Sequence, residues 1–551
     1  METETTVHGS MDLPVGVDWD RLPDGRAEND HQTNGDHRSE DDNRTSDDHH
    51  QQAPHAASQP DQQDSGEQDR IPARLERWKE KLKRELGLDK SFEVQIREMP
   101  FGEHRIAFLF LSVFMKDATM VDVLKQISWL DPATLSHEAM ESYLTQYVPA
   151  MQVKKTESFN EMIGQVLMGD TAFYIDGQPA VLMIDAKQFP ARNPEQPALE
   201  KVVRGSKDGF TETLLMNVGL VRRRLRDGQA RFEMMKVGER TQTDVCIGYL
   251  ADVANPKLVE SVRDKIKKVK IDGIPLADKQ LEEMMLKKNW SPFPLVRYTE
   301  RPDVVSAQLL DGSVAILTDT SPSAMLLPTT VFDLVQHAEE SRENPFMGTY
   351  LRWVRFIGIL ASMFLMPIWY MYAQNTALRP DWLWFVGAHE AGVLPLILQF
   401  VIAELGVDMI RLAAIHTPAP LVTAMTLLSA ILIGDIAVKT GLFINEVILY
   451  MSVSAIGMFA TPSYELGLAN RIVRLGLLLA VFLFKAPGFI VGTTLLVVLL
   501  AMERSFNTPY MWPLIPFNGP ALLSVLLRRP MPANKMRPSL NRPLKSRKQP
   551  T

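Results

Sequence analysis

Three ionisable residues interrupt a stretch of sequence that is otherwise apolar. Glu404, Asp408 and Arg411 are separated by four and three positions, so in a helix of 3.6 residues per turn they lie on one face. Because charged groups are costly to expose to lipid, that face should turn toward protein or water. Two interpretations stay open: the acids line a pathway for cations, or they form an internal ion pair, Asp408 with Arg411 or Glu404 with a protonated Asp408, that joins helices.

Two further acids lie beside apolar stretches. Asp435 is followed one turn later by Lys439, a pattern that also suits a membrane surface. Glu446 begins another apolar stretch, where an acid favours the amino-terminal end of a helix dipole. We predict that Asp435 joins Glu404 and Asp408 along an ion path and that Arg411 is the internal ion partner.

The sequence lacks the spaced motifs of the common enzyme classes. It contains no P-loop, no dinucleotide glycine fingerprint, no HExxH and no paired CxxC. Its one cysteine, Cys246, cannot form an internal disulfide, which is typical of a reducing compartment. We therefore expect a protein that is not an enzyme, with no catalytic residue, cofactor, metal site or nucleic-acid partner.

The elements that position these residues fall into a polar and an apolar part. A bilayer crossing needs about 20 mainly apolar residues, and we predict a helical membrane domain over 346–505 with four to six membrane segments. Four of them are expected near 353–372, 392–415, 420–438 and 443–460. The stretch 472–502 is interrupted at Lys485-Ala486-Pro487-Gly488, so it could form two short helices, a re-entrant hairpin or one kinked span.

The polar part predicts an α+β fold with mixed sheet hairpins. Residues 1–70 are rich in Asp, His, Asn, Gln and Ser, which is typical of a disordered tail. Two cytosolic subdomains are expected over 71–200 and 201–345. The predicted elements are strands 106–113, 232–237 and 244–250, helices 120–127 and 256–269, and two hairpins, one of 172–175 with 180–184 and one of 304–310 with 313–318.

The carboxy-terminal segment 506–551 ends in a basic tail. From residue 528 onward it carries only cations among its charged groups: Arg528, Arg529, Lys535, Arg537, Arg542, Lys545, Arg547 and Lys548. The positive-inside rule therefore predicts a cytoplasmic tail. With a cytosolic amino-terminal part, the number of full crossings should be even.

Several separated motifs resemble the GerA family of spore germination proteins. They are Gly209–Leu214, Glu300–Val305, Asp311–Leu317, Pro462-Ser463-Tyr464-Glu465-Leu466, and Pro509-Tyr510 with Pro513-Leu514-Ile515-Pro516. The resemblance covers about residues 75–530. Within the family, 413–418, 433–437 and the basic tail differ from the A subunits of nutrient receptors, which usually have an uncharged Gln-like residue in place of Asp435.

The resemblance implies an endospore-forming bacterium, the spore inner membrane and a part in germination. Receptor A subunits are thought to form oligomeric channels for monovalent cations, so we expect a homo-oligomeric cation channel in the lipid bilayer, working beside other germination membrane proteins. Two alternatives remain: a non-conducting scaffold that organises germinant receptors, and a secondary transporter, for which internal repetition between membrane halves is typical.

Overall fold

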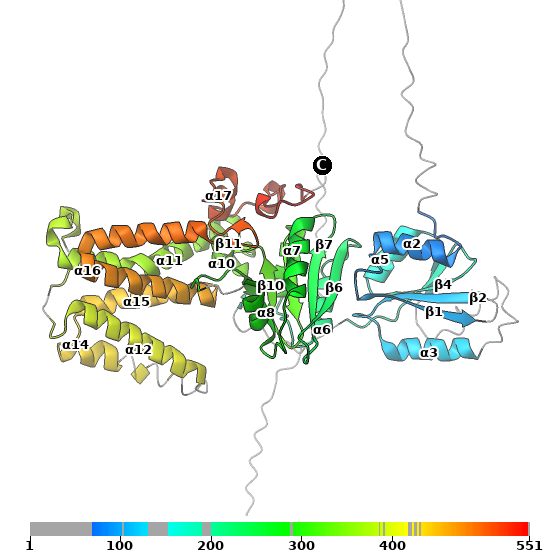
Figure 1. The fold of residues 1–551 in the computed structure, drawn as a ribbon, viewed down its shortest axis with the longest axis horizontal. Helices are drawn as coiled ribbons and strands as arrows, with labels where there is room; N and C mark the ends of the chain where they lie inside the picture. Colours follow the sequence, from blue (N-terminus) through cyan, green and yellow to red (C-terminus); the bar gives the residue numbers. More distant parts are fainter. Residues whose placement is uncertain are drawn as a thin grey trace, which may run out of the picture. The chain divides into compact units, whose positions relative to one another are not determined.

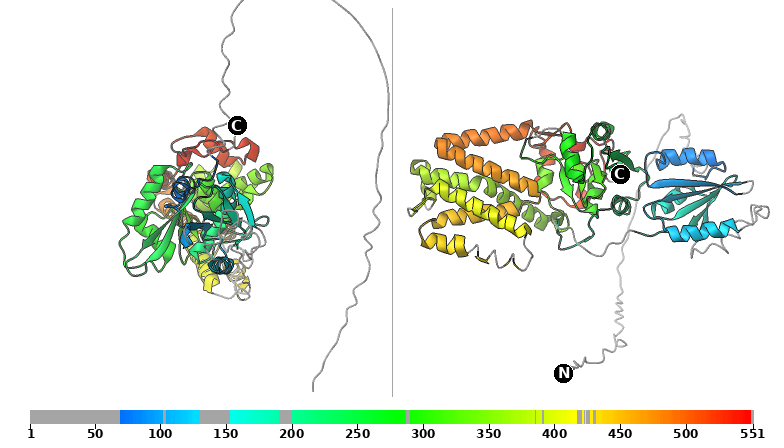
Figure 2. Two further views of the ribbon diagram at one scale, coloured as in Figure 1. Left: turned by 90° about the vertical axis from the view of Figure 1, so that its right-hand side faces the viewer. Right: turned by 60° about the horizontal axis from the view of Figure 1, so that its bottom comes forward.

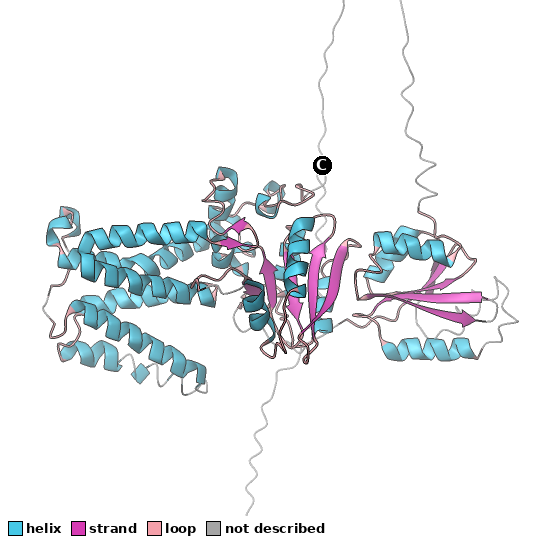
Figure 3. Cartoon of the chain, in the orientation of Figure 1, coloured by secondary structure: helices cyan, strands magenta, loops and turns pink. Residues whose placement is uncertain are grey.

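The structure is a computed structural model. It describes residues 69–101, 104–129, 153–189, 200–286, 290–384, 386–389, 392–416 and 431–548, together with a few positions between 421 and 428. The predicted disordered tail lies almost wholly outside these residues, as does most of the span predicted near 420–438. Figure 3 shows that strands are confined to the first part of the chain and to one short hairpin, whereas the rest is helical.

The first five-stranded sheet has helices on both faces. Its order is β1 (Val94–Phe101), β2 (His104–Leu111), β4 (Thr171–Ile175), β5 (Val181–Ile184) and β3 (Val153–Thr156). Alternate residues of a strand face opposite sides. Ala107 and Leu109 therefore pack toward α2 (Leu75–Glu85) and α5 (Phe159–Leu167), whereas Phe108 packs toward α3 (Asp117–Ser128) (Figure 1).

The second sheet has the same architecture. Its order is β6 (Ala230–Val237), β7 (Thr243–Leu250), β9 (Val314–Thr318), β10 (Ala324–Leu327) and β8 (Arg297–Thr299). Helices α6 (Leu214–Arg222) and α9 (Pro302–Leu310) cover one face, and α7 (Pro256–Lys267) and α8 (Ala277–Leu286) cover the other. Every pairing between these strands is antiparallel, and so is every pairing in the first sheet, so the sheets are antiparallel rather than mixed.

One predicted element was wrong. Residues 304–310, expected to be a strand of a hairpin, belong to helix α9. Pro302 stands at its first turn and Asp303 follows, both of which favour a helix start. Val305 and Leu309 are buried against the sheet, so tertiary packing outweighs the strand preference of the Val304-Val305 pair. The other predicted strands and helices of this part are confirmed within a few residues of their bounds.

Most of the described residues from 345 to 526 lie in helices. These helices are α11 (Pro345–Gln374), α12 (Leu396–His416), a π-helical segment (Ile431–Ile436), α14 (Ala437–Lys439), α15 (Asn445–Phe459), α16 (Tyr464–Met502) and the short α17 (Gly519–Leu526). Among the described residues, α11 and α16 are long and apolar enough to cross a membrane. The spans predicted near 392–415 and 443–460 correspond to α12 and α15.

Helix α16 is an antiparallel hairpin rather than one rod. Lys485 has φ 54° and ψ −135°, outside the helical region. A Cβ on Gly488 would lie 2.1 Å from the carbonyl oxygen of Ala480. Eight helical residues span about 12 Å in a straight helix, so the chain must reverse at Lys485. Two arms, 464–484 and 486–502, lie side by side (Figures 1 and 2), which excludes the single kinked span.

Candidate functional site

One cluster of buried charges in the helical region is formed by side chains of α12 and α16. Glu404, on α12, is 1% exposed, and its Oε1 lies 2.5 Å from Nη2 of Arg474 on the first arm of α16. Its Oε2 lies 3.1 Å from Nε of Arg471. Arg474 also donates to the carbonyl oxygen of Ser362 on α11, at 2.7 Å. The ion pairs of Glu404 with Arg471 and Arg474, together with the hydrogen bond from Arg474 to Ser362, therefore connect three helices.

The same cluster extends along α12 to Asp408, whose carboxylate pairs with Arg471. Asp408 is less buried than Glu404, with 27% of its side chain exposed. The acids are four residues apart on α12 and the arginines three residues apart on α16, so each set lies on one face of its helix. The two faces meet in one contact between the helices, which we call the helix–helix seam.

Arg411, the predicted internal partner, makes a different contact. Its guanidinium lies 4.2 Å from the ring centroid of Tyr464, at the start of α16, a cation–π arrangement. The cations that pair with the acids are Arg471 and Arg474, which the sequence analysis did not single out. The signal was available, because two arginines three residues apart in an apolar stretch are as costly to bury as the two acids.

Asp435 is not part of this cluster. It pairs with Lys439 at 2.6 Å, and both side chains are more than half exposed. Glu446, near the start of α15, accepts from the backbone N–H of His389 at 3.2 Å and lies 2.8 Å from its Nδ1. The structure thus brings together Glu404 and Asp408 and places Asp435 elsewhere.

The Pro462-Ser463-Tyr464-Glu465 motif connects α15 to α16. The Ser463 hydroxyl accepts from the N–H of Leu466 and caps α16. Glu465 Oε1 lies 2.8 Å from Nζ of Lys279 on α8. Lys279 also pairs with Glu282 at 2.7 Å. Burial alone would lower the pKa of Lys279, but the hydrogen bonds and charges of Glu282 and Glu465 outweigh burial and raise this pKa above its ordinary value. The motif therefore ties the helices to the second sheet.

The Glu300–Val305 motif forms a second junction. Arg301 is fully buried and makes two hydrogen bonds to Asp303, at 3.1 and 2.9 Å, and two to the carbonyl oxygens of Glu200 and Ser206. Asp303 also pairs with Arg342, just before α11. Burial opposes ionisation of Asp303, but the bonds and charges of Arg301 and Arg342 outweigh it and hold its pKa below the ordinary value.

The chain returns to the second sheet after α16. Ser505 is buried and its hydroxyl donates to the carbonyl oxygen of Leu295 at 2.7 Å and accepts from the N–H of Thr329. The basic tail lies on the same subdomain, where Lys545 pairs with Asp252 at 2.6 Å and the Asn541 amide donates to the carbonyl oxygen of Asp311 at 3.0 Å. Both ends of the helical region therefore lie against one α/β subdomain.

Comparisons with known proteins match most of the chain. The profile described as Bacillus/Clostridium GerA spore germination protein matches residues 80–540. The chain is 44% identical to stage V sporulation protein AF of Bacillus subtilis (strain 168) over 482 residues, covering 88% of this chain and 97% of that protein. It is 27% identical to spore germination protein KA of the same strain over 463 residues, covering 83% and 84%.

A solved structure also matches the chain. The N-terminal domain of the A subunit of the Bacillus megaterium spore germinant receptor GerK3 covers 47% of this chain and 95% of that chain, at 24% identity and a TM-score of 0.37.

Proposed function

Because this chain belongs to the GerA family of spore germination proteins, we propose that it is a multi-pass subunit of a homo-oligomeric channel that conducts monovalent cations during germination. The observation that carries this proposal is the ladder of charges on α12. Glu404 is buried near the middle of that helix, Asp408 is partly exposed, and Arg411 follows. At 1.5 Å per residue the ladder spans about 10 Å, a large fraction of an acyl-chain layer.

The topology that goes with this function is an even number of crossings. Pro345 begins the first membrane helix beside the second subdomain, and Ser505 returns to that subdomain after the last one. The turns that connect the helices lie at two opposite ends. At the end near the second subdomain, Glu465 pairs with Lys279. At the far end, the N–H of Val393 donates to the carbonyl oxygen of Gly441. With the basic tail on the same side, the positive-inside rule favours a cytoplasmic α/β region under the spore inner membrane.

The two acids have different roles in this proposal. Glu404 is enclosed by Arg474 and Arg471 and acts as the structural lock, because removing one member of a buried pair leaves an uncompensated charge. Asp408 lies at the edge of the seam, beside exposed apolar residues of α12 such as Leu405, Met409 and Leu412. A neighbouring subunit on that apolar face would leave Asp408 facing the pathway, where a carboxylate attracts cations.

The experiment is a flux measurement with the full chain in potassium-loaded liposomes. We expect release of K⁺, and we expect Asp408→Asn to reduce cation selectivity while the oligomer persists. Asp435→Asn is the matched control, because it removes the same charge from an exposed pair outside the cluster. Unchanged flux and selectivity in Asp408→Asn would remove this acid from the pathway.

A non-conducting scaffold is the second candidate, favoured by one observation. Both clustered acids are neutralised by arginines, which is typical of charges that join helices. An intact oligomer that releases no K⁺ from liposomes, and whose Glu404→Gln variant loses assembly, would support the scaffold over the channel.

A further inference from the structure

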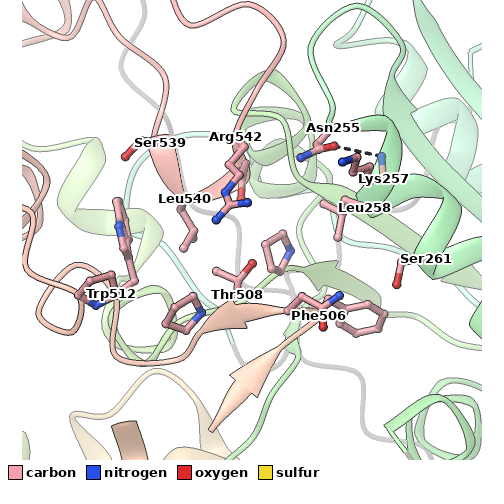
Figure 4. Close-up of a pocket in the computed structure, with 15 residues that line it drawn as sticks. Asn255, Lys257, Leu258, Ser261, Phe506, Thr508, Trp512, Ser539, Leu540 and Arg542 are labelled. Atoms are coloured by element: carbon pink, nitrogen blue, oxygen red, sulfur yellow. Dashed lines mark hydrogen bonds between the residues drawn. The ribbon is translucent and has the colours of Figure 1, made fainter. Parts of the chain in front are cut away.

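A cavity of about 330 Å³ lies where the carboxy-terminal segments meet the second subdomain. Four segments line it: the start of α7, Pro328 after β10, the hairpin of β11 (Arg504–Ser505) and β12 (Thr508–Pro509) with the residues after it, and tail residues 539–542. Figure 4 shows Arg542 extending from the tail toward Thr508 of that hairpin. The volume lies within the range of small-molecule sites.

The lining is positive on one part and apolar on another. It contains two cations, Lys257 and Arg542, and no acid. Among the described residues, neither cationic side chain forms an ion pair or a hydrogen bond that would neutralise it. Hydroxyl groups of Ser261, Thr508 and Ser539 also line the cavity, and the positive end of the α7 dipole adds to the field.

The apolar part consists of aromatic and aliphatic walls. Phe506 and Trp512 contribute rings, and Leu258 and Leu540 contribute aliphatic groups. Phe506 is 7% exposed, and Nζ of Lys265 lies 4.0 Å from its ring centroid. This wall gives a ligand an apolar surface beside the charged one.

Backbone strain is concentrated around this cavity. Phe506, Asn507 and Arg542 have φ of 46°, 66° and 44°, the left-handed region that residues with a Cβ rarely adopt. Seven such non-glycine residues occur in the described chain, and three of them line this one cavity. Strained residues held in place by their surroundings cluster at ligand sites.

We propose that this cavity binds a phosphate ester, with the phosphate between Lys257, Arg542 and the hydroxyl groups and the organic part against Trp512 and Phe506. A phosphate offers several acceptor oxygens, which suits two cations and three hydroxyls from separate elements. The Phe506 turn follows the end of α16 by only a few residues, so the ester is either a lipid headgroup or a free metabolite of the same chemistry. The proposal is independent of ion conduction.

The test uses the full chain in nanodiscs. In phosphatidylcholine nanodiscs, binding of radiolabelled glycerol 3-phosphate is measured by equilibrium dialysis. In nanodiscs of mixed phosphatidylcholine and phosphatidylglycerol, bound anionic lipid is counted by native mass spectrometry. The variants are Lys257→Gln and Arg542→Asn; Asn tolerates the left-handed backbone at 542, so a loss of binding there reports the lost charge rather than misfolding.

The matched control is Lys267→Gln, which removes the same charge from the other end of α7, outside the cavity. Glycerol 3-phosphate affinity that falls about tenfold or more in both cavity variants, but not in the control, supports a free phosphate ester. Loss of retained phosphatidylglycerol in the cavity variants alone supports a lipid headgroup. Binding of neither probe by the folded wild-type chain, or equal losses in Lys267→Gln, would overturn the proposal.

Discussion

The two α/β subdomains share one topology. Both sheets follow the strand order one, two, four, five, three in their own numbering. Phe159 and Pro302 begin corresponding helices, and Thr171 and Val314 begin corresponding strands; each pair is 143 residues apart. The same offset relates Gly169 to Gly312, both with positive φ. The segments 159–184 and 302–327 are therefore two copies of one supersecondary unit.

Hydrogen bonds at corresponding positions repeat as well. Asp176 Oδ1 accepts from the N–H of Leu75, the first residue of α2, at 2.9 Å. Asp319 Oδ1 accepts from the N–H of Leu214, the first residue of α6, at 3.1 Å. In each subdomain the loop between the last two strands thus caps the first helix. A shared scaffold is the simplest account of this agreement in contacts.

The subdomains differ where the second one meets other parts of the chain. Ser158, a neutral cap of α5, corresponds to the buried cation Arg301. The turn at Gly169 meets residues of its own subdomain, whereas a Cβ on Gly312 would lie 3.3 Å from Pro543 of the tail. At these positions the first subdomain contacts only itself, whereas the second uses the same scaffold to contact other parts of the chain.

The largest expected effect is at the Arg301 position. Arg301→Gln should lower the free energy of unfolding of the second subdomain by about 3 kcal/mol, because Asp303 and two partly buried carbonyl oxygens lose the donors of a fully buried cation. Ser158→Ala, at the corresponding position, should lower that of the first subdomain by about 1 kcal/mol, the cost of a helix cap. Hydrogen exchange of the full chain in micelles measures each subdomain separately. Equal losses would contradict the assignment of a junction role to Arg301.

The junction should also show its own pH dependence. Burial, with the nearby charges of Arg355, Arg297 and Arg301, lowers the pKa of His337 from 6.5 to about 4. Between pH 6.5 and about 4, His337 is protonated in the unfolded chain but neutral in the folded chain. The free energy of unfolding therefore decreases as the pH falls from 6.5 to about 4. The loss should be about 2 kcal/mol after allowance for solvent screening.

His337→Gln keeps a hydrogen-bond acceptor for the N–H of Glu339, which now bonds to Nδ1 at 3.2 Å, but does not titrate. Exchange protection around the start of α11 should then no longer fall over this pH range. A wild-type chain whose protection near α11 is independent of pH between 6.5 and 4 would exclude this coupling.

The sequence predicted a helix or strand correctly where its local preference agreed with its packing in the fold. Asp176-Gly177 and Pro256 mark a turn and a helix start by their own chemistry, and those elements are confirmed. Val304-Val305 favours a strand locally, and the burial of one face of α9 against the sheet, which includes Val305 and Leu309, makes it helical. Comparison with 159–167 at the 143-residue offset could have corrected this prediction.

The candidate site was predictable in part. The spacing of Glu404 and Asp408 indicated a buried face, and the structure places both acids in one seam. Their partners Arg471 and Arg474 come from another helix, with Arg471 lying 67 residues from Glu404 in sequence, and no local pattern fixes which helices pack together. The reversal at Lys485 likewise depends on the antiparallel packing of the two arms of α16. Pro487 and Gly488 alone indicate an interruption but do not determine its geometry.

The glycine turns give a smaller contrast. Gly312→Ala and Gly169→Ala should each lower stability by about 1–2 kcal/mol, since φ of +89° and +105° disfavours a Cβ. Only Gly312→Ala should also loosen the tail, because its Cβ meets Pro543. Limited trypsin digestion would show the difference as faster cleavage after Lys545 and Arg547, since Arg537 and Arg542 precede proline and are not cut. The same cleavage rate in both variants would argue against docking of the tail on this turn.

The smallest effect separates the two capping aspartates. Asn caps a helix as well as Asp, so Asp176→Asn and Asp319→Asn keep the cap and change only the charge. Asp176 also pairs with Arg105 at 3.1 Å, and its N–H donates to the carbonyl oxygen of Arg105 at 2.9 Å. The N–H of Asp319 makes the equivalent bond, also 2.9 Å, to the carbonyl oxygen of Asp244. By this contact, rather than by the 143-residue offset, an acid stands in the second subdomain where the first has Arg105.

Removing the charge at 176 therefore loses an ion pair, whereas Asp319 forms no ion pair among the described residues. We expect Asp176→Asn to destabilise the first subdomain by up to about 1 kcal/mol and Asp319→Asn to leave the second unchanged or slightly more stable. Hydrogen exchange of the α2 and α6 peptides at low salt measures both, and added salt should shrink both effects together, because each is a screened surface interaction. A difference of the opposite sign would mean that the two loops, although alike in backbone contacts, do not share one electrostatic environment around their caps.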